Sequence, residues 1–153
     1  MVKEMYSTFR NRKINVLPID FSLDIEEIVI ASFKNYLLLC KDDKMKKVFM
    51  IVESEKFIDE IAKNIYLDET HTMLKATNKL FSSIQEVKNI EIVNLEELAQ
   101  LYCLYAHELV LLTVLNDPIF NEERCISSIK EFIKKFLKIR RWFLWMNVVK
   151  KRD

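Results

Sequence analysis

The spacing of apolar residues along the chain predicts a series of amphipathic helices. Apolar positions recur at helical intervals over residues 23–40, after Ser22, which we expect to cap this first helix. VFMIVES (residues 48–54) is too short for periodicity to separate strand from helix, but its helical neighbours favour helix. Residues 54–66 repeat the helical spacing, and Asp68 is expected to cap a further helix.

The most apolar helix is expected over residues 94–115. KNIEIV (residues 88–93) is a connector with some strand character, and Asn94 is the predicted helix start, with Glu97 at the capping-box position. On a helical wheel the polar residues fall within one arc of roughly 120°; they are Glu96, Glu97, Gln100, His107 and Glu108. The remaining surface is apolar, with Leu98, Leu101, Tyr102, Leu104, Tyr105, Leu109 and Leu112. Such a helix is expected to be surrounded by others.

A turn is predicted after this helix, at Asp117 and Pro118. Asn121 is then expected to start the last helical stretch. Since no strong breaker follows, residues 119–153 are predicted to form one long helix or two helices bent near residues 138–141.

A membrane span is the competing interpretation of the apolar helix. A span needs about 20 apolar residues, and an acid at the bilayer centre costs about 2.5 to 3.5 kcal/mol on insertion scales. Glu108 lies in the middle of the segment, with His107 beside it. We therefore expect a helix of a globular core and no transmembrane segment.

Length and composition favour a single all-α domain over residues 1–153, a bundle of six to seven helices around a buried central helix. Residues 1–21 are expected to form an N-terminal arm or a short strand. The chain contains no glycine, which excludes the Walker loop, the dinucleotide fingerprint and the G-x-S-x-G nucleophile elbow. Its formal net charge of +1 gives no general attraction to nucleic acid.

Three cysteines, Cys40, Cys103 and Cys125, are widely spaced and form no C-x-x-C pair. The N-terminal residues have no apolar core of the kind that a secretory leader contains. Reduced, buried thiols and a cytoplasmic location are therefore expected.

Few residues are suited to chemistry. Cys103 and His107 are spaced i, i+4 and could offer two metal ligands, but no local pattern supplies a third and fourth from His71, Cys40, Cys125 or a carboxylate. Pairs of glutamates stand at predicted helix starts, where the helix dipole explains them. We expect no catalytic set, no metal and no cofactor, and hence a protein that is not an enzyme.

The C-terminal part combines basic and aromatic residues. The basic patch consists of Lys134, Lys135, Lys138, Arg140 and Arg141, interleaved with Phe132, Phe136, Trp142, Phe143 and Trp145. This combination can bind nucleic acid or an anionic membrane surface. It is equally typical of a terminal helix whose aromatic face docks on the core, and the stripe of Ile129, Ile133, Phe136 and Leu137 favours that interpretation. Nucleic acid is thus disfavoured as a partner.

Two segments carry a resemblance to a known family. FSLDIEEIVIASFKNY (residues 21–36) has an acidic start and a later aromatic, and LAQLYCLYAHELVLL (residues 98–112) is an apolar helix with small residues and a cysteine. With the chain length and the basic end VVKKRD, the order of elements resembles the poxviral Bcl-2-like proteins. The resemblance implies a cytoplasmic virulence factor that binds a host adaptor or kinase and blocks signalling toward nuclear factor kappa B or interferon regulatory factors.

The other branch of the family binds pro-apoptotic helices in a groove. If that branch applied, the partner-binding residues would be Phe49, Phe57, Ile61, Tyr66 and Leu101. Cellular survival proteins of this fold carry an Asn-Trp-Gly-Arg motif at the start of the central helix, whereas the corresponding residues here read NLEELAQ. This departure favours the signalling branch, with self-association as a homodimer through aromatic helix faces. A subunit of a larger helical assembly stays an alternative, because a fold does not specify which surface is used.

Overall fold

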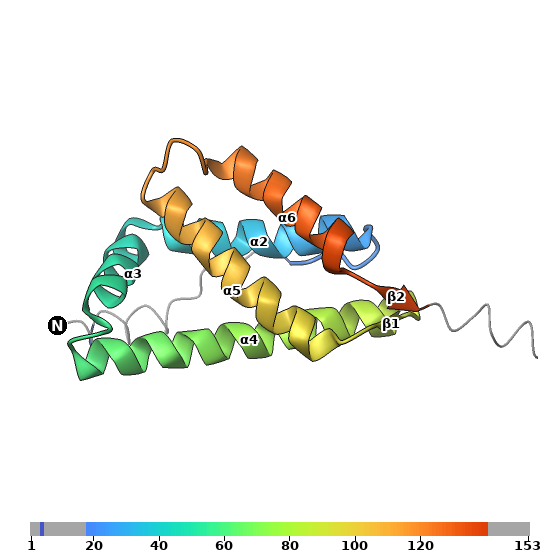
Figure 1. The fold of residues 1–153 in the computed structure, drawn as a ribbon, viewed down its shortest axis with the longest axis horizontal. Coiled ribbons are helices and arrows are strands. Elements are labelled where there is room, and N and C mark those ends of the chain that lie inside the picture. Colours follow the sequence, from blue (N-terminus) through green and yellow to red (C-terminus); the bar gives the residue numbers. More distant parts are fainter. Residues whose placement is uncertain (1–3, 5–17, 141–153) are drawn as a thin grey trace, which may run out of the picture.

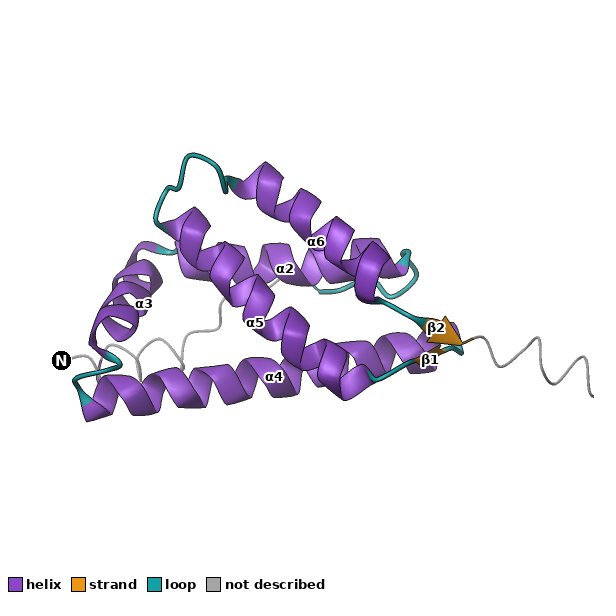
Figure 2. Cartoon of the chain, in the orientation of Figure 1, coloured by secondary structure: helices purple, strands orange, loops and turns teal. Residues whose placement is uncertain are grey.

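The computed structural model describes Glu4 and residues 18–140, which form a helical bundle with one very small sheet (Figure 1). The elements are α2 (Ile25–Lys41), α3 (Asp43–Glu55), α4 (Glu60–Lys88), β1 (Glu91–Ile92), α5 (Leu95–Val114), α6 (Glu122–Phe136) and β2 (Ile139–Arg140). Figure 2 shows how little of the described chain is strand. The prediction of an all-α fold is confirmed, and the helix predicted for VFMIVES is α3. The described residues contain five helices, against six to seven predicted for the whole chain.

The core forms where α5 crosses α2, α4 and α6 (Figure 1). Its largest fully buried side chains come from these four helices and include Phe33, Ile28, Leu37, Ile84, Ile129 and Val110. Ile19 and Phe21, which precede α2, pack against the same core. Within the described residues no helix is both long enough and apolar enough to cross a membrane.

The central helix α5 is covered on only part of its circumference. Its buried stripe includes small residues at helical spacing, Ala99, Cys103, Ala106 and Val110, alongside Leu98, Tyr102 and Leu109. Leu101 and Leu104 are instead exposed. The small side chains on the buried face let the neighbouring helices approach closely. The two large side chains of Leu101 and Leu104 lie on the opposite, solvent-exposed side. The prediction that other helices encircle α5 is therefore wrong for this face.

Asparagine takes the place of glycine at the helix ends. The residues of the described chain with positive φ are Asn89, Asn94 and Asn116, at 50°, 53° and 57°. Left-handed backbone is costly for most residues, and asparagine is one of the few that adopt it readily. Asn94 does precede α5, as predicted, but its side chain makes no capping hydrogen bond. Its backbone conformation, not its amide, directs the chain into the helix.

Two predicted helix starts are corrected. Helix α2 is capped by Asp24 and not by Ser22, whose hydroxyl lies 2.7 Å from the carboxylate of Asp20. Asp24 donates its backbone N–H to Glu27 at 3.2 Å, so the first turn is closed two residues later than expected. In contrast, Asn121 caps α6 as predicted and accepts a hydrogen bond from the Arg124 backbone at 2.9 Å.

Asp68 does not start a helix, because it lies inside α4. This helix begins after Asp59, whose carboxylate accepts a hydrogen bond from the Ala62 backbone at 2.8 Å. Neither glycine nor proline interrupts the sequence over residues 60–88, so one long helix forms where two were predicted.

The end of α6 also differs from the prediction. The helix stops at Phe136, and the chain then forms β2, which pairs antiparallel with β1 in the register Glu91↔Arg140 and Ile92↔Ile139. The backbone N–H of Val93 adds a hydrogen bond to Lys138 at 2.9 Å. The strand character predicted for KNIEIV is thus confirmed, whereas a helix continuing as far as Arg140 is wrong. Of the predicted arm or short strand over residues 1–21, residues 18–21 form no strand. The rest of that segment apart from Glu4, like the chain after residue 140, lies outside the described residues.

Candidate functional site

Helix α3 is attached to the bundle through a small apolar cluster of its own and through the partly buried Phe49, which packs against the main core. Val48 and Val52 of α3 meet Ile65 of α4, with Tyr66 packed beside them. Helix α3 has 13 residues but buries only three of them, Met45, Val48 and Val52. This is a small apolar face, and most helical stability in proteins comes from packing of such a face. Polar contacts therefore contribute to the position of this helix.

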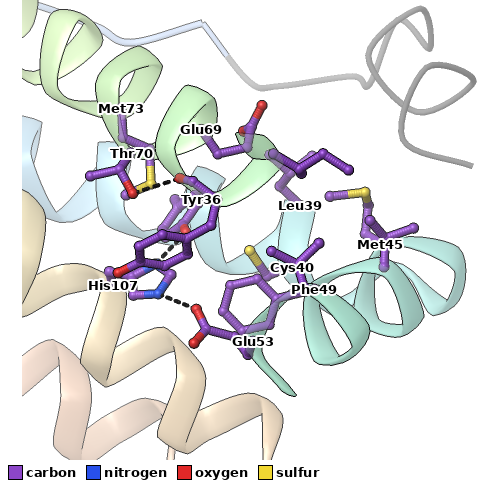
Figure 3. Close-up of a pocket in the computed structure, with 14 residues that line it drawn as sticks. Tyr36, Leu39, Cys40, Met45, Phe49, Glu53, Glu69, Thr70, Met73 and His107 are labelled. Carbon is purple, nitrogen blue, oxygen red and sulfur yellow. Dashed lines mark hydrogen bonds and ion pairs between the residues drawn. The ribbon is translucent and has the colours of Figure 1, made fainter. Parts of the chain in front are cut away.

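The polar contacts centre on His107 of α5 (Figure 3). Its Nε2 lies 2.7 Å from the Glu53 carboxylate of α3, and its Nδ1 lies 3.2 Å from the Tyr36 hydroxyl of α2. A carboxylate can only accept, so Nε2 is the donor to Glu53, and the tautomer that satisfies both contacts accepts at Nδ1 from the Tyr36 hydroxyl. One imidazole thus joins three helices.

Lys56 completes the group, which we call the His107 cluster: Tyr36, Glu53, Lys56 and His107. Its ammonium lies 2.6 Å from the second carboxylate oxygen of Glu53 and 4.1 Å above the ring centre of Tyr66. The rings of Phe49 and Tyr66 lie 5.4 and 6.0 Å from the His107 ring. Both oxygens of the carboxylate have partners, and aromatic rings shield the cluster from water.

The pKa shifts follow from this arrangement. Burial raises the pKa of Glu53, but hydrogen bonds from His107 and Lys56 outweigh burial and leave its pKa below the usual 4.5. Burial lowers the pKa of Lys56, but its hydrogen bond to Glu53 outweighs this and the net pKa is raised. Burial raises the pKa of Tyr36 well above its usual value. The shifts keep Glu53 ionised, Lys56 charged and the Tyr36 hydroxyl protonated near neutral pH.

The thiols near the cluster are protonated and unreactive. Burial raises the pKa of Cys40 to about 12 and also raises the pKa of Cys103. A thiol is nucleophilic only as the thiolate, so these cysteines are unsuited to catalysis near neutral pH. The prediction of buried, unpaired thiols is confirmed for all three cysteines.

The cavity beside the cluster is small. It has a volume of about 50 Å³ and is lined by the cluster residues Tyr36, Glu53 and His107 together with Cys40, Phe49, Tyr66, the polar Glu69 and Thr70, and neighbouring apolar residues (Figure 3). A single water needs roughly 10–15 Å³ of such space, whereas ligand pockets usually measure about 300–1,000 Å³. The cavity has room for a few waters and is too small for a substrate.

Cys103 and His107 do not form a shared metal site. The Cys103 thiol interacts with Thr77 of α4, whereas His107 faces Glu53 of α3. Cys125 interacts instead with the Thr113 hydroxyl at 3.2 Å, and His71 is exposed on α4. Among residues 18–140 no three or more His, Cys, Asp or Glu side chains are close enough to hold a metal ion.

The five residues predicted to bind a partner lie in three places. Phe49 and Tyr66 line the small cavity. Phe57 is exposed in the turn between α3 and α4, and Ile61 is exposed in the first turn of α4. Leu101 is exposed on α5, where it lines the groove between α5 and α6. They do not line one groove.

The sequence pointed neither to Glu53 nor to Tyr36 as partners of His107, because they are 54 and 71 residues away from it in the chain. The one local signal was the i, i+3 spacing of Glu53 and Lys56.

The basic patch is solvent-exposed where it is described. Lys134, Lys135, Lys138 and Arg140 all carry exposed side chains, and Lys134 lies 3.6 Å from Glu131 on the same helix. Arg141 lies outside the described residues.

Comparison with known proteins does not add to this picture: no protein-family model, curated protein or solved structure matches the chain. What defines the class of protein is therefore its fold, an all-α bundle in which a partly buried polar cluster joins α2, α3 and α5.

Replacing Glu53 with glutamine is expected to destabilise the fold. The amide carries no charge for Lys56 and cannot accept through its nitrogen, and a hydrogen bond to a charged group contributes about 1.5–3 kcal/mol. Glu122→Gln is the matched control, because Glu122 pairs with Lys41 in an exposed ion pair, and such pairs contribute about 0–1 kcal/mol. Urea unfolding of both variants measures the difference. Equal losses would contradict a structural role for the cluster.

The contribution of Glu53 is expected to depend on pH in the acid range. Its folded pKa lies below the unfolded value of about 4.5, so its stabilising effect is complete above that pH and is lost as the pH falls through the folded pKa. The difference in unfolding free energy between the wild type and Glu53→Gln should therefore shrink as the pH falls below 4.5. A constant difference from neutral pH down to strongly acidic pH would contradict the shift.

Proposed function

We propose that the protein is a non-catalytic cytoplasmic interaction module that antagonises host innate immune signalling. In this proposal it binds a signalling adaptor or kinase of the pathways toward nuclear factor kappa B or interferon regulatory factors, using a Bcl-2-like helical fold. The order of helices resembles that family, and three unpaired thiols fit a reducing compartment.

The observation that carries the proposal is an exposed apolar corner between α3 and α4. The apolar corner consists of Phe57, Ile58 and Ile61, and the first two side chains are 87% and 81% exposed. Adjacent large apolar side chains in water favour burial against another surface, and contiguous apolar patches mark interaction sites. Aromatic side chains such as Phe57 also supply much of the anchoring at protein interfaces.

The apolar corner is held in place before any partner binds. The backbone N–H groups of Ile58 and Asp59 both donate to the carbonyl of Glu55, at 3.0 and 2.8 Å. Lys56 lies 5.4 Å from the ring centre of Phe57 and connects it to Glu53 of the His107 cluster. A preorganised surface loses less conformational entropy on binding, which favours affinity.

Two features weigh against the alternatives. The polar groups of the His107 cluster are satisfied by one another, and the nearby thiols are protonated, which does not favour catalysis. Phe49 and Tyr66 line a cavity of about 50 Å³, far smaller than the groove that a pro-apoptotic helix would need. The signalling branch of the resemblance is therefore the one that we propose.

A reporter assay in cells tests the proposal. The wild-type protein should reduce the output of a nuclear factor kappa B or interferon regulatory factor reporter severalfold. Phe57→Asp combined with Ile58→Asp should abolish the reduction without unfolding the protein, because both side chains are already in water. Val87→Asp, an equally drastic change at an exposed position near the other end of α4, should act like the wild type.

Two outcomes would count against the proposal. Unchanged reporter output with well-expressed wild-type protein would remove the signalling function. Full inhibition by the Phe57 and Ile58 variant would remove the apolar corner as the binding surface.

A further inference from the structure

A second exposed apolar surface lies along the outer side of α5, apart from the apolar corner. Its side chains follow one another at intervals of three or four residues, which places them in one row along a helix. We call this row the leucine stripe; it consists of Leu101, Leu104, Leu111 and Leu115, with Glu108 in the middle. Leu101, Leu104 and Leu115 are 53%, 58% and 50% exposed, and Leu111 is half-buried. Figure 1 shows α5 crossing in front of α2, and among the described elements none covers its outer side.

The leucine stripe has the spacing and the length of a surface that binds another helix. In a coiled coil the contact residues alternate between intervals of three and four, at the heptad positions a and d. Leu101, Glu108 and Leu115 occupy a-type positions of this pattern, and Leu104 and Leu111 occupy d-type positions. Over these residues the row is roughly 21 Å long at 1.5 Å per residue. Exposed leucines gain free energy when they leave water, so a helix with the same spacing is the matching occupant.

Glu108 specifies the charge of that occupant. It is exposed in the middle of the stripe, so an apolar helix packed over the leucines would take its carboxylate out of water without a counter-charge, which is costly. Among the described residues Lys56 attracts Glu108 electrostatically, but the Lys56 ammonium pairs with Glu53 at 2.6 Å. A lysine or arginine on the docked helix, opposite Glu108, supplies the counter-charge. The carboxylate therefore disfavours wholly apolar helices and favours a basic one.

A second copy of α5 does not provide this charge. The stripe contains no basic residue, so α5 packed against α5 of another copy brings Glu108 against a leucine or against the second Glu108. We propose that the leucine stripe binds an amphipathic helix of another protein, which carries aliphatic side chains at its a and d positions and a lysine or arginine opposite Glu108. This proposal is independent of the signalling function, because the leucine stripe and the apolar corner share no residue.

Reversal of the charges tests the pairing directly. The probe is a fluorescein-labelled helical peptide of about 21 residues, with leucine at its a and d positions and one lysine at the central a position. Fluorescence anisotropy should show that this peptide binds the wild-type protein, and that glutamate in place of its lysine weakens binding about tenfold or more. Glu108→Lys should reverse the preference, because the new cation pairs with the glutamate peptide. Glu86→Lys, the same change at an exposed position on α4, should leave the preference as in the wild type.

The apolar part of the contact is tested in the same assay. Leu104→Asp should abolish binding of the lysine peptide, whereas Leu38→Asp on α2, where Leu38 is 60% exposed, should not, with circular dichroism to show that both variants are folded. Equal binding of the lysine and glutamate peptides by the wild type would overturn the proposal, and so would no detectable binding of either.

Other occupants of the leucine stripe give different results. If a second copy covered it, the sedimentation coefficient of the wild type would rise with protein concentration and Leu104→Asp would remove this dependence. If another part of the same chain covered it, the wild type would be a monomer that does not bind the lysine peptide. Either result would also overturn the proposal.

Discussion

The hydrogen bond between His107 and Glu53 is the contact on which one end of the molecule depends. Helix α3 buries only Met45, Val48 and Val52, and apart from the partly buried Phe49 its apolar cluster is separate from the core around α5. Glu53 is buried enough that it would be costly without partners, and His107 and Lys56 supply them. The same contact that satisfies a buried charge therefore fixes the helix that leads into the apolar corner.

Sequence reasoning located the features that depend on nearby residues. The extent of α5, the course of α2 after its first turn, the cap at Asn121 and the strand character before α5 follow from periodicity and turn chemistry within a few residues. The exposure of Leu101 could not be predicted, because a helical wheel does not reveal which apolar side a neighbour covers. The covered side of α5 carries the small residues Ala99 and Ala106, which allow close approach of the adjacent helices, together with larger apolar residues.

The candidate site was less accessible to sequence reasoning than the fold. Tyr36, Glu53 and His107 come from three helices, and no local pattern links them. His107 drew attention only through its spacing from Cys103, which turned out to face a different neighbour, Thr77. Phe57 and Ile61 were expected to line a groove together with Leu101, yet they are exposed at a helix turn, because α4 starts only at Glu60.

Hydrogen exchange of the α3 amides tests most directly whether His107 holds this helix. His107→Phe keeps a ring between Phe49 and Tyr66 but removes the donor to Glu53. The account predicts that the amides of α3 exchange faster in this variant, whereas those in the core of α2, α5 and α6 keep their protection, because the main core is a separate cluster. Unchanged protection of α3, or an equal loss in every helix, would contradict it.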